Sequence, residues 1–182
     1  KRIGFTGPFW PVNPKRSHIG GHACFTTLDD LPDAPDAVFL AVPKDAAIES
    51  LEKLSTMGAG GVVCYTAGFG ETGTPEGIAA QARLVEIAGT TGLRLMGPNC
   101  IGFSHIASKA LVSFFAVLGS AQADAATIGL VSQSGALGNA LSQAAECGIP
   151  FSHRLTAGNS CDVDVADLVA YLAEAPDCHA IA

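Results

Sequence analysis

Short apolar runs alternate with amphipathic helical patterns along most of this chain, and this alternation limits the fold more than any other feature. Runs at 36–42, 61–68, 93–96, 127–132 and 151–156 are each short enough to be a buried strand. Helical patterns follow four of these runs, at 44–58, 76–91, 134–147 and 163–174. Because repeated strand-helix-strand units build helix-covered parallel sheets, we expect an α/β protein with mostly parallel strands.

Capping residues mark the ends of the predicted helices. Asp45 is the predicted N-cap of the first helix, and Gly58 is its C-terminal stop. Thr74 followed by Pro75 has the cap-then-proline order that begins a helix. The helix predicted at 134–147 ends at Gly148. The helix predicted at 163–174 is capped by Asp162 and stopped by Pro176.

The periodicity is lost from Ser104 to Ala126, where "LGSAQADAA" is small and polar enough for an exposed connection. We therefore expect two α/β units, residues 1–123 and 124–182. The chain opens at Lys1 without a methionine, and it stops at "HAIA", where another strand starts. These ends lead us to expect a piece of a longer polypeptide, incomplete at both termini.

Charge is distributed unevenly along the chain. The formal net charge of -7 argues against a general nucleic-acid binder. Residues 1–28 hold four basic residues and no acidic one, whereas the other 6 basic and 17 acidic residues give -11. The first segment is therefore suited to a small polyanion. No apolar run reaches the roughly 20 residues of a spanning helix and no leader resembles a signal peptide, so we expect a cytoplasmic protein without membrane contact.

The six cysteines lie far apart, with no CxxC pair and no zinc-ligand spacing. We expect reduced thiols and no metal site. Asp162, Asp164 and Asp167 have a spacing that fits helix capping better than a metal site.

Glycine-rich and polar loops follow the predicted strands. In open parallel sheets, ligands bind beyond the carboxyl ends of the strands, where the following helix N-termini present free N–H groups. A single glycine turn is weak evidence of a ligand, but six such loops on one edge favour one. The loops are "NPKR" (13–16), "AVPKDA" (41–46), "TAGFGETG" (66–73), "GPNCIGF" (97–103), "SQSGAL" (132–137) and "TAGNSCD" (156–162).

These motifs, in this order, resemble the nucleoside-diphosphate-forming acyl-CoA synthetases, the superfamily that includes the succinyl-CoA synthetase α-subunit. The resemblance implies a CoA-binding Rossmann-like domain over 1–123 and the start of a flavodoxin-like ligase domain over 124–182. It implies formation of an acyl-CoA from a carboxylic acid, CoA and ATP or GTP, through an acyl phosphate and a phosphohistidine.

The resemblance assigns CoA contacts to the earlier loops. It places Asn13, Pro14 and Lys15 at the adenosine end of CoA, where lysine acts as a point charge on phosphate. It places Val42, Pro43, Thr66, Ala67, Gly68, Phe69, Asn99 and Cys100 along the CoA channel. Alternatives remain: the cations of the first loop as solvated surface, and Phe69 as simple core. Cys100 is better explained as a small filler than as a nucleophile, because no nearby histidine or lysine lowers its pKa.

The resemblance assigns a phosphate site to the later loops. The helix that begins at "SQSG" points its N-terminus, with unpaired N–H donors, at the phosphate. The residues assigned to this site are Ser132, Gln133, Ser134 and Gly135, together with Asn159, which with Gly158 resembles a turn bordering the active site. The alternative for Ser134 is a plain N-cap.

Several parts of the family's machinery have no counterpart in this sequence. None of the five histidines lies in the glycine-rich setting of the phosphohistidine, so no catalytic residue is assigned here. ATP or GTP with magnesium is expected in a nucleotide-grasping domain or β-subunit, and an oligomer and the identity of the acid stay open. One alternative is a non-catalytic CoA-sensing module fused to another domain such as a protein acetyltransferase. An NAD-dependent oxidoreductase is disfavoured, because no GxGxxG directly follows a strand.

Overall fold

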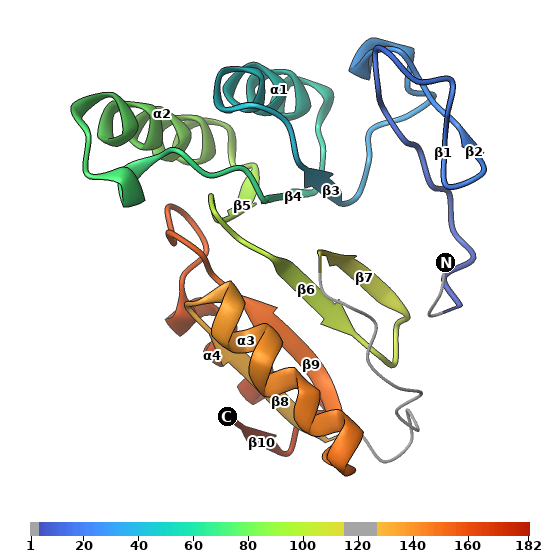
Figure 1. The fold of residues 1–182 in the computed structure, drawn as a ribbon, viewed down its shortest axis with the longest axis vertical. Coiled ribbons are helices and arrows are strands. Elements are labelled where there is room, and N and C mark those ends of the chain that lie inside the picture. Colours follow the sequence, from blue (N-terminus) through green and yellow to red (C-terminus); the bar gives the residue numbers. More distant parts are fainter. Residues whose placement is uncertain (1–3, 115–126) are drawn as a thin grey trace.

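The computed structural model describes residues 4–114 and 127–182, and these form two main sheets flanked by helices (Figure 1). The first sheet has the order β3 (Val38–Leu40), β4 (Gly61–Cys64), β5 (Arg94–Met96), and all three strands are parallel. The second sheet has five strands in the order β10-β8-β9-β6-β7. The predicted α/β class with parallel strands is confirmed.

Two helices cover the first sheet and bury its main core. α1 (Lys44–Met57) follows β3, and α2 (Pro75–Thr91) follows β4. Leu51 and Leu54 of α1 and Leu84 of α2 are completely buried, in one cluster with the strand residues Cys64 and Leu95. Fully burying an aliphatic side chain contributes about 1.5–3 kcal/mol, so this cluster holds the strand ends in a fixed arrangement.

The predicted helix ends are confirmed at three of the four positions tested in this unit. Gly58 ends α1 in the left-handed conformation, with φ 78°. Thr74 caps α2 by accepting a hydrogen bond from the amide of Gly77, and Pro75 is the first helical residue. The prediction of Asp45 as N-cap is wrong, because Pro43 occupies that position and Asp45 lies in the first turn. There its carboxylate still favours the positive end of the helix.

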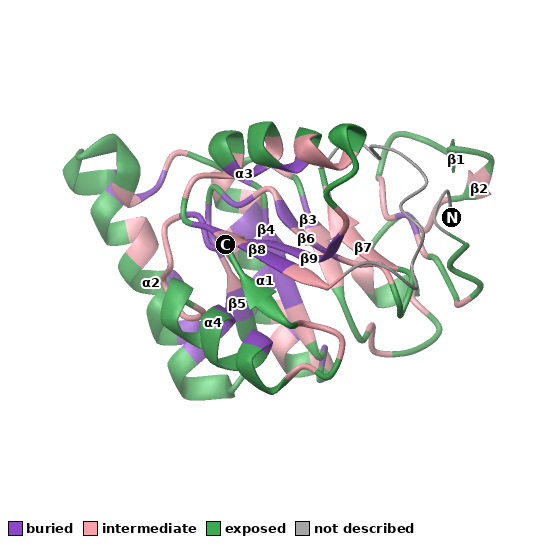
Figure 2. Cartoon of the chain, turned by 90° about the horizontal axis from the view of Figure 1, so that it is seen from below, coloured by how far each residue is buried: buried purple, intermediate pink, exposed green. Residues whose placement is uncertain are grey.

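The second unit continues the alternation of strands and helices. Its elements are β8 (Ile128–Ser132), α3 (Gly135–Ser142), the 3-10 turn Gln143–Cys147, β9 (Phe151–Thr156), α4 (Val165–Glu174) and β10 (Ala180–Ile181). β8, β9 and β10 are mutually parallel, and α3 and α4 lie on opposite faces of the sheet (Figure 2). The strand predicted at the end of the chain is therefore present, whereas the helix predicted at 134–147 changes to 3-10 geometry after Ser142.

The N-cap predicted for the last helix is wrong. Asp164, not Asp162, caps α4, and it forms a capping box in which its side chain and that of Asp167 each accept the other residue's amide. Asp162 instead accepts a hydrogen bond of 2.8 Å from the amide of Leu95. This contact links the loop after β9 to the first sheet.

A hairpin that the sequence pattern did not indicate joins the second sheet. β6 (Gly102–His105) and β7 (Ala110–Ser113) are antiparallel, and β6 also pairs antiparallel with β9. The two segments read GFSH and ALVS, and neither is a run of four apolar residues or a strict alternation of apolar and polar residues. The chain therefore reaches the second sheet by Gly102, whereas the predicted boundary between 123 and 124 lies outside the described residues.

The remaining described elements are short. They are the hairpin of β1 (His18–Ile19) and β2 (His22–Ala23) and the 3-10 turns Leu28–Asp30 and Gly70–Thr72. Among the described residues, no helix combines the length and the apolar character needed to span a bilayer.

Candidate functional site

A pocket of about 750 Å³ lies where the loops after five strands of the two sheets converge. These are the loops after β3, β4, β5, β8 and β9. The lining residues are Ala41, Val42, Pro43, Tyr65, Thr66, Ala67, Asn99, Ile101, Gln133, Ser134, Gly135, Ala136 and Gly158. The structure thus brings together eight residues that the sequence assigned to CoA or phosphate: Val42, Pro43, Thr66, Ala67, Asn99, Gln133, Ser134 and Gly135.

Hydrogen bonds between the loops fix the shape of this pocket. The amide of Asn99 donates to the carbonyl of Thr66 at 2.9 Å, which ties the loop after β5 to the loop after β4. The side chain of Gln133 donates to the carbonyl of Gly158 at 2.7 Å, and the Gly158 amide donates back to the Gln133 carbonyl at 3.1 Å. Gln133 is therefore engaged with the neighbouring loop through both its side chain and its backbone.

The N-terminus of α3 forms one wall of the pocket. Ser134 is its N-cap, and its hydroxyl accepts a hydrogen bond from the amide of Leu137 at 3.3 Å. The hydroxyl of Ser132 donates to the carbonyl of Ser134 at 2.9 Å, which fixes the turn that leads into the helix. Gly135 and Ala136 are the first two helical residues, and amides at these positions have no intrahelical acceptor. This wall can donate hydrogen bonds to an anion.

The loops after β3 and β4 contribute mostly apolar side chains to the pocket. Val42, Pro43 and Ala67 line it together with Tyr65. The ring of Tyr65 stacks on Phe114, with 4.9 Å between ring centroids. A ligand with a thin, partly apolar arm and an anionic end would match both walls.

Phe69 and Cys100 are buried and do not line the pocket. Phe69 is fully buried in the core cluster that also holds residues of α1, α2 and the first sheet. Cys100 is also fully buried, and its thiol donates to the carbonyl of Thr156 at 2.9 Å. Burial raises the pKa of Cys100, so its thiol stays protonated and is a poor nucleophile.

Gly68, Asn159 and Ser132 support the pocket without lining it. The amides of Gly68 and Phe69 donate to the carboxylate of Glu71, and so does the side-chain amide of Asn159. Partial burial opposes ionisation of Glu71, but the hydrogen bonds from Asn159 and from the backbone outweigh it, so the pKa of Glu71 is lowered. Asn159 also donates to Gln81 at 2.9 Å, beside a second, more open cavity of about 540 Å³.

The first predicted loop lies outside the lining of both cavities. The side chain of Asn13 accepts a hydrogen bond from the amide of Lys15 at 2.9 Å, which shapes a local turn with Pro14 inside it. Lys15 and Arg16 are exposed. In this structure the loop offers positive charge at the surface.

Sequence reasoning missed several residues of the site. Ala41, Tyr65, Ile101 and Ala136 line the pocket. Ala41, Ile101 and Ala136 lie inside the loop motifs but were not assigned to the site, and Tyr65 directly precedes the motif at 66–73. The contacts of Glu71 and Gln81 carried no signal in the sequence, because their partner Asn159 is 88 and 78 residues away in the chain.

Comparisons with known proteins agree with this geometry. The family described as CoA binding domain matches residues 3–106, and the succinyl-CoA ligase like flavodoxin domain matches residues 125–182. Acetate--CoA ligase [ADP-forming] II subunit alpha of Pyrococcus furiosus is 36% identical over 97% of this chain, and a trans-feruloyl-CoA synthase from an unknown prokaryotic organism is 34% identical over 98%.

A solved structure shows the same arrangement. The dinucleotide forming acetyl-coenzyme A synthetase 1 of Ca. Korarchaeum cryptofilum, in complex with phosphate and ADP, superposes with a TM-score of 0.86 at 30% identity and covers 99% of this chain. The chain spans only part of these proteins: 37% and 25% of the two curated relatives and 38% of the solved chain.

Proposed function

The chain belongs to the nucleoside-diphosphate-forming acyl-CoA synthetases, as their CoA-binding domain and the start of their flavodoxin-like ligase domain, and we propose that its pocket binds CoA next to a phosphoryl group. The protein that contains it forms an acyl-CoA from a carboxylic acid, CoA and ATP or GTP. The observation that carries the proposal is the shared pocket, which is lined both by the N-terminus of α3 and by the loops after β3 and β4.

The phosphoryl group binds at the N-terminus of α3. The amides of Gly135 and Ala136 donate to its oxygens, with the Ser134 hydroxyl at the same end of the helix. A Cβ on Gly135 would lie 2.6 Å from the Ile101 side chain, so glycine leaves the helix start close to its neighbours and open to a ligand. Ser132 and Asn159 do not contact the phosphoryl group and instead fix the two turns that border the site.

The pantetheine arm of CoA runs along the apolar wall of Val42, Pro43 and Ala67 toward Asn99. Gly68, Phe69 and Cys100 shape this channel from below through packing and backbone bonds. Asn13, Pro14 and Lys15 receive the phosphates at the adenosine end, and the excess of basic residues in 1–28 attracts them.

The chemistry is completed by groups outside this chain. Among the described residues, no histidine lines the pocket, so a mobile phosphohistidine must come from another part of the protein. ATP or GTP with magnesium binds to a nucleotide-grasping domain, on the same polypeptide or on a β-subunit.

The direct test is an activity assay with the full-length protein, any β-subunit, ATP or GTP, CoA and a panel of carboxylic acids. We expect formation of acyl-CoA and of a nucleoside diphosphate in equal amounts. Residues 1–182 alone should bind CoA in calorimetric titration without producing any diphosphate. CoA binding by the full-length protein without diphosphate formation from any acid would favour a CoA-sensing module instead.

A charge variant tests the adenosine end of the site. Lys15→Ala should weaken CoA binding several-fold and leave inorganic phosphate binding unchanged, because its charge meets only the adenosine phosphates. Lys53→Ala is the matched control, since Lys53 pairs with Asp29 on the surface of α1 and not with the pocket. Equal losses of CoA affinity in both variants would argue for a nonspecific charge effect.

A further inference from the structure

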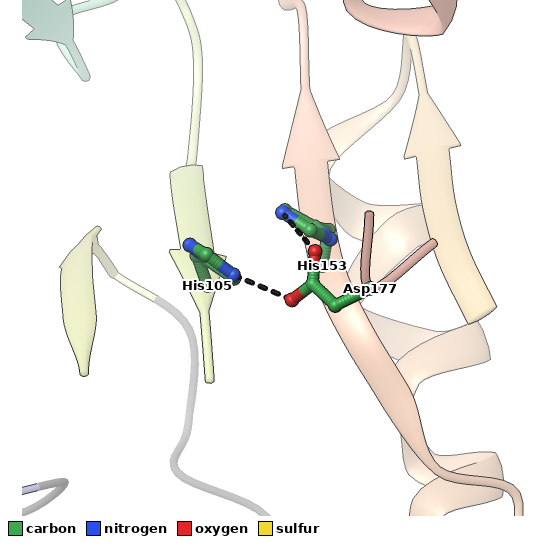
Figure 3. A group of neighbouring side chains, drawn as sticks. All are labelled: His105, His153 and Asp177. Carbon is green, nitrogen blue, oxygen red and sulfur yellow. Dashed lines mark hydrogen bonds and ion pairs between the residues drawn. The ribbon is translucent and has the colours of Figure 1, made fainter. Parts of the chain in front are cut away.

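Two histidines and one aspartate converge on the face of the second sheet that α4 covers (Figure 3). His105 on β6 and His153 on β9 are directly paired across the two strands, and their rings stack with 4.1 Å between centroids. Asp177, between α4 and β10, places one carboxylate oxygen 2.7 Å from Nε2 of His105 and the other 4.0 Å from Nε2 of His153. One ligand atom from each residue lies within 4.8 Å of the others.

A serine hydroxyl lies within hydrogen-bond distance of Nδ1 of each ring, the nitrogen that does not face Asp177. Ser108 Oγ lies 2.8 Å from Nδ1 of His105, and Ser152 Oγ lies 3.0 Å from Nδ1 of His153. Ser152 is also within 3.3 Å of the carbonyl of Ile128, to which its hydroxyl can donate. It then accepts the Nδ1 proton of His153, and the lone pair of His153 is left on Nε2.

That Nε2 atom is the anomaly of the cluster. The side chain of His153 is 1% exposed, and Nε2 has no hydrogen-bond partner. Burial and the neighbouring His105 lower the pKa of His153, which keeps the ring neutral. A buried lone pair that faces a carboxylate oxygen at 4.0 Å without a hydrogen bond is unfavourable, and a cation between the two atoms would relieve this cost.

We propose that His105, His153 and Asp177 bind one divalent metal ion of the Zn²⁺ type. Ligand atoms at about 2.0–2.2 Å from a tetrahedral Zn²⁺ ion lie roughly 3.4 Å apart, so the 4.0 Å between His153 Nε2 and the Asp177 carboxylate leaves room for the ion after a small inward shift. Two imidazoles and one carboxylate are ligands that such ions prefer, and serine partners at Nδ1 orient the rings as outer-shell groups do in metal sites. The ion would take the place of the direct contact between His105 Nε2 and the Asp177 carboxylate.

The position of the cluster permits entry of an ion and suggests a structural effect. His105 and Asp177 have side chains that are 22% and 31% exposed, so the site opens to solvent on one side. The ion would join β6, β9 and the segment after α4, which are distant in the sequence. His153 is three residues from Thr156 along β9, about 10 Å from the pocket end of that strand, so the ion binds apart from the pocket.

Competition between the purified protein and a chromophoric chelator for Zn²⁺ tests the proposal. We expect one Zn²⁺ per chain, a higher unfolding temperature with Zn²⁺, and visible absorption when Co²⁺ is used instead. His105→Asn and Asp177→Asn change partly exposed side chains and should keep the fold, as circular dichroism can verify. Each should weaken Zn²⁺ binding by more than about 100-fold, beyond the roughly 10–100-fold expected for the outer-shell Ser152→Ala.

Two controls make the result specific. His179→Gln removes an exposed histidine two residues from Asp177 and should leave Zn²⁺ affinity unchanged. Cys178→Ser removes the adjacent thiol and should also leave it unchanged. Absence of stoichiometric binding, binding that survives His105→Asn and Asp177→Asn, or binding lost with Cys178→Ser would each overturn the proposal. CoA titration of the same variants should be normal, so failure here is distinguishable from failure of the proposed function.

Discussion

At the scale of single residues, Ser134 combines a structural role and a proposed binding role. Its hydroxyl caps α3, and it lines the pocket at the place proposed for the phosphoryl group. Thr74 caps α2 in the same way, accepting the amide of Gly77 at 3.1 Å, but it lies outside the pocket lining. Comparing substitutions at these two residues therefore separates the loss of stability that comes from a missing N-cap from the loss of affinity that comes from a missing ligand contact.

We predict that Ser134→Ala lowers the free energy of unfolding by about 1 kcal/mol and also weakens phosphate binding. Thr74→Ala should cause a similar loss of stability and no change in phosphate binding, because losing an N-cap costs about 0.5–2 kcal/mol wherever the helix lies. Chemical denaturation and phosphate titration measure the two effects. Unchanged phosphate affinity in Ser134→Ala would show that this serine is only a cap.

The carboxylate of Glu71 makes the stability of the folded protein depend on pH. Its carboxylate accepts hydrogen bonds from Gly68, Phe69 and Asn159, and its pKa is lowered although partial burial opposes this. A carboxyl group with a lowered pKa in the folded state contributes stability that is complete above its unfolded pKa of about 4.3. That contribution is lost as the pH falls through the folded pKa.

We predict that Glu71→Gln is less stable than the unmodified protein at pH 7, and that the difference shrinks below about pH 4.3. Unfolding free energies measured between pH 3 and pH 7 test this. Glu49→Gln, which changes an exposed glutamate of α1, is the control and should show no such convergence. A stability difference independent of pH would contradict the role assigned to the charge of Glu71.

At the scale of elements, the loop after β9 is fitted against the loop after β5. Gly158 has φ +61°, and a Cβ there would lie 2.4 Å from the carbonyl oxygen of Pro98. Gly148 ends the turn after α3 with φ +86°, but a Cβ there would meet nothing within 4 Å. The two positions share the left-handed conformation and differ in the space around them.

We predict that Gly148→Ala costs about 1–2 kcal/mol, the cost of placing a Cβ in the left-handed region. Gly158→Ala should cost clearly more and should also weaken CoA binding, since one of the two loops must move away from the pocket. Denaturation and CoA titration of both variants provide the comparison. Equal destabilisation by the two substitutions would show that the contact between the loops is not tight.

At the scale of the whole molecule, the two sheets are joined where the pocket lies. Hydrogen bonds from Asn159 to Pro98 and from Cys161 to Gly97 connect the loop after β9 to the loop after β5. Asp162 adds the contact to Leu95. A ligand in the pocket touches loops from both sheets and therefore stabilises the folded state of both.

We predict that CoA at about 100 times its dissociation constant raises the free energy of unfolding by about 2.7 kcal/mol, as expected for a ligand that binds only the folded state. The rise should be seen equally by probes in each sheet, such as amide exchange in β4 and β9. NAD at the same concentration should have no effect. Equal stabilisation by NAD would favour the oxidoreductase that the sequence disfavours.

The sequence by itself determined the parallel strands of the two main sheets, the helices and most of the pocket. Apolar periodicity and local caps identified β4, α2 and β8, because these elements are stabilised by neighbours in the chain or by a long buried face. Motifs directly after the strands identified Thr66, Asn99 and Ser134, since parallel strands bring their carboxyl ends to a common edge.

The tertiary structure alone decided which residues meet across the chain. It places the β6–β7 hairpin in the second sheet, and it makes Asp164, not the predicted Asp162, the cap of α4. It also shows that Phe69 is part of the core. It also brought Glu71 to Asn159, and His105 to His153 and Asp177. Such contacts depend on strand order and packing between segments far apart in sequence, and no local pattern of residues encodes those distances.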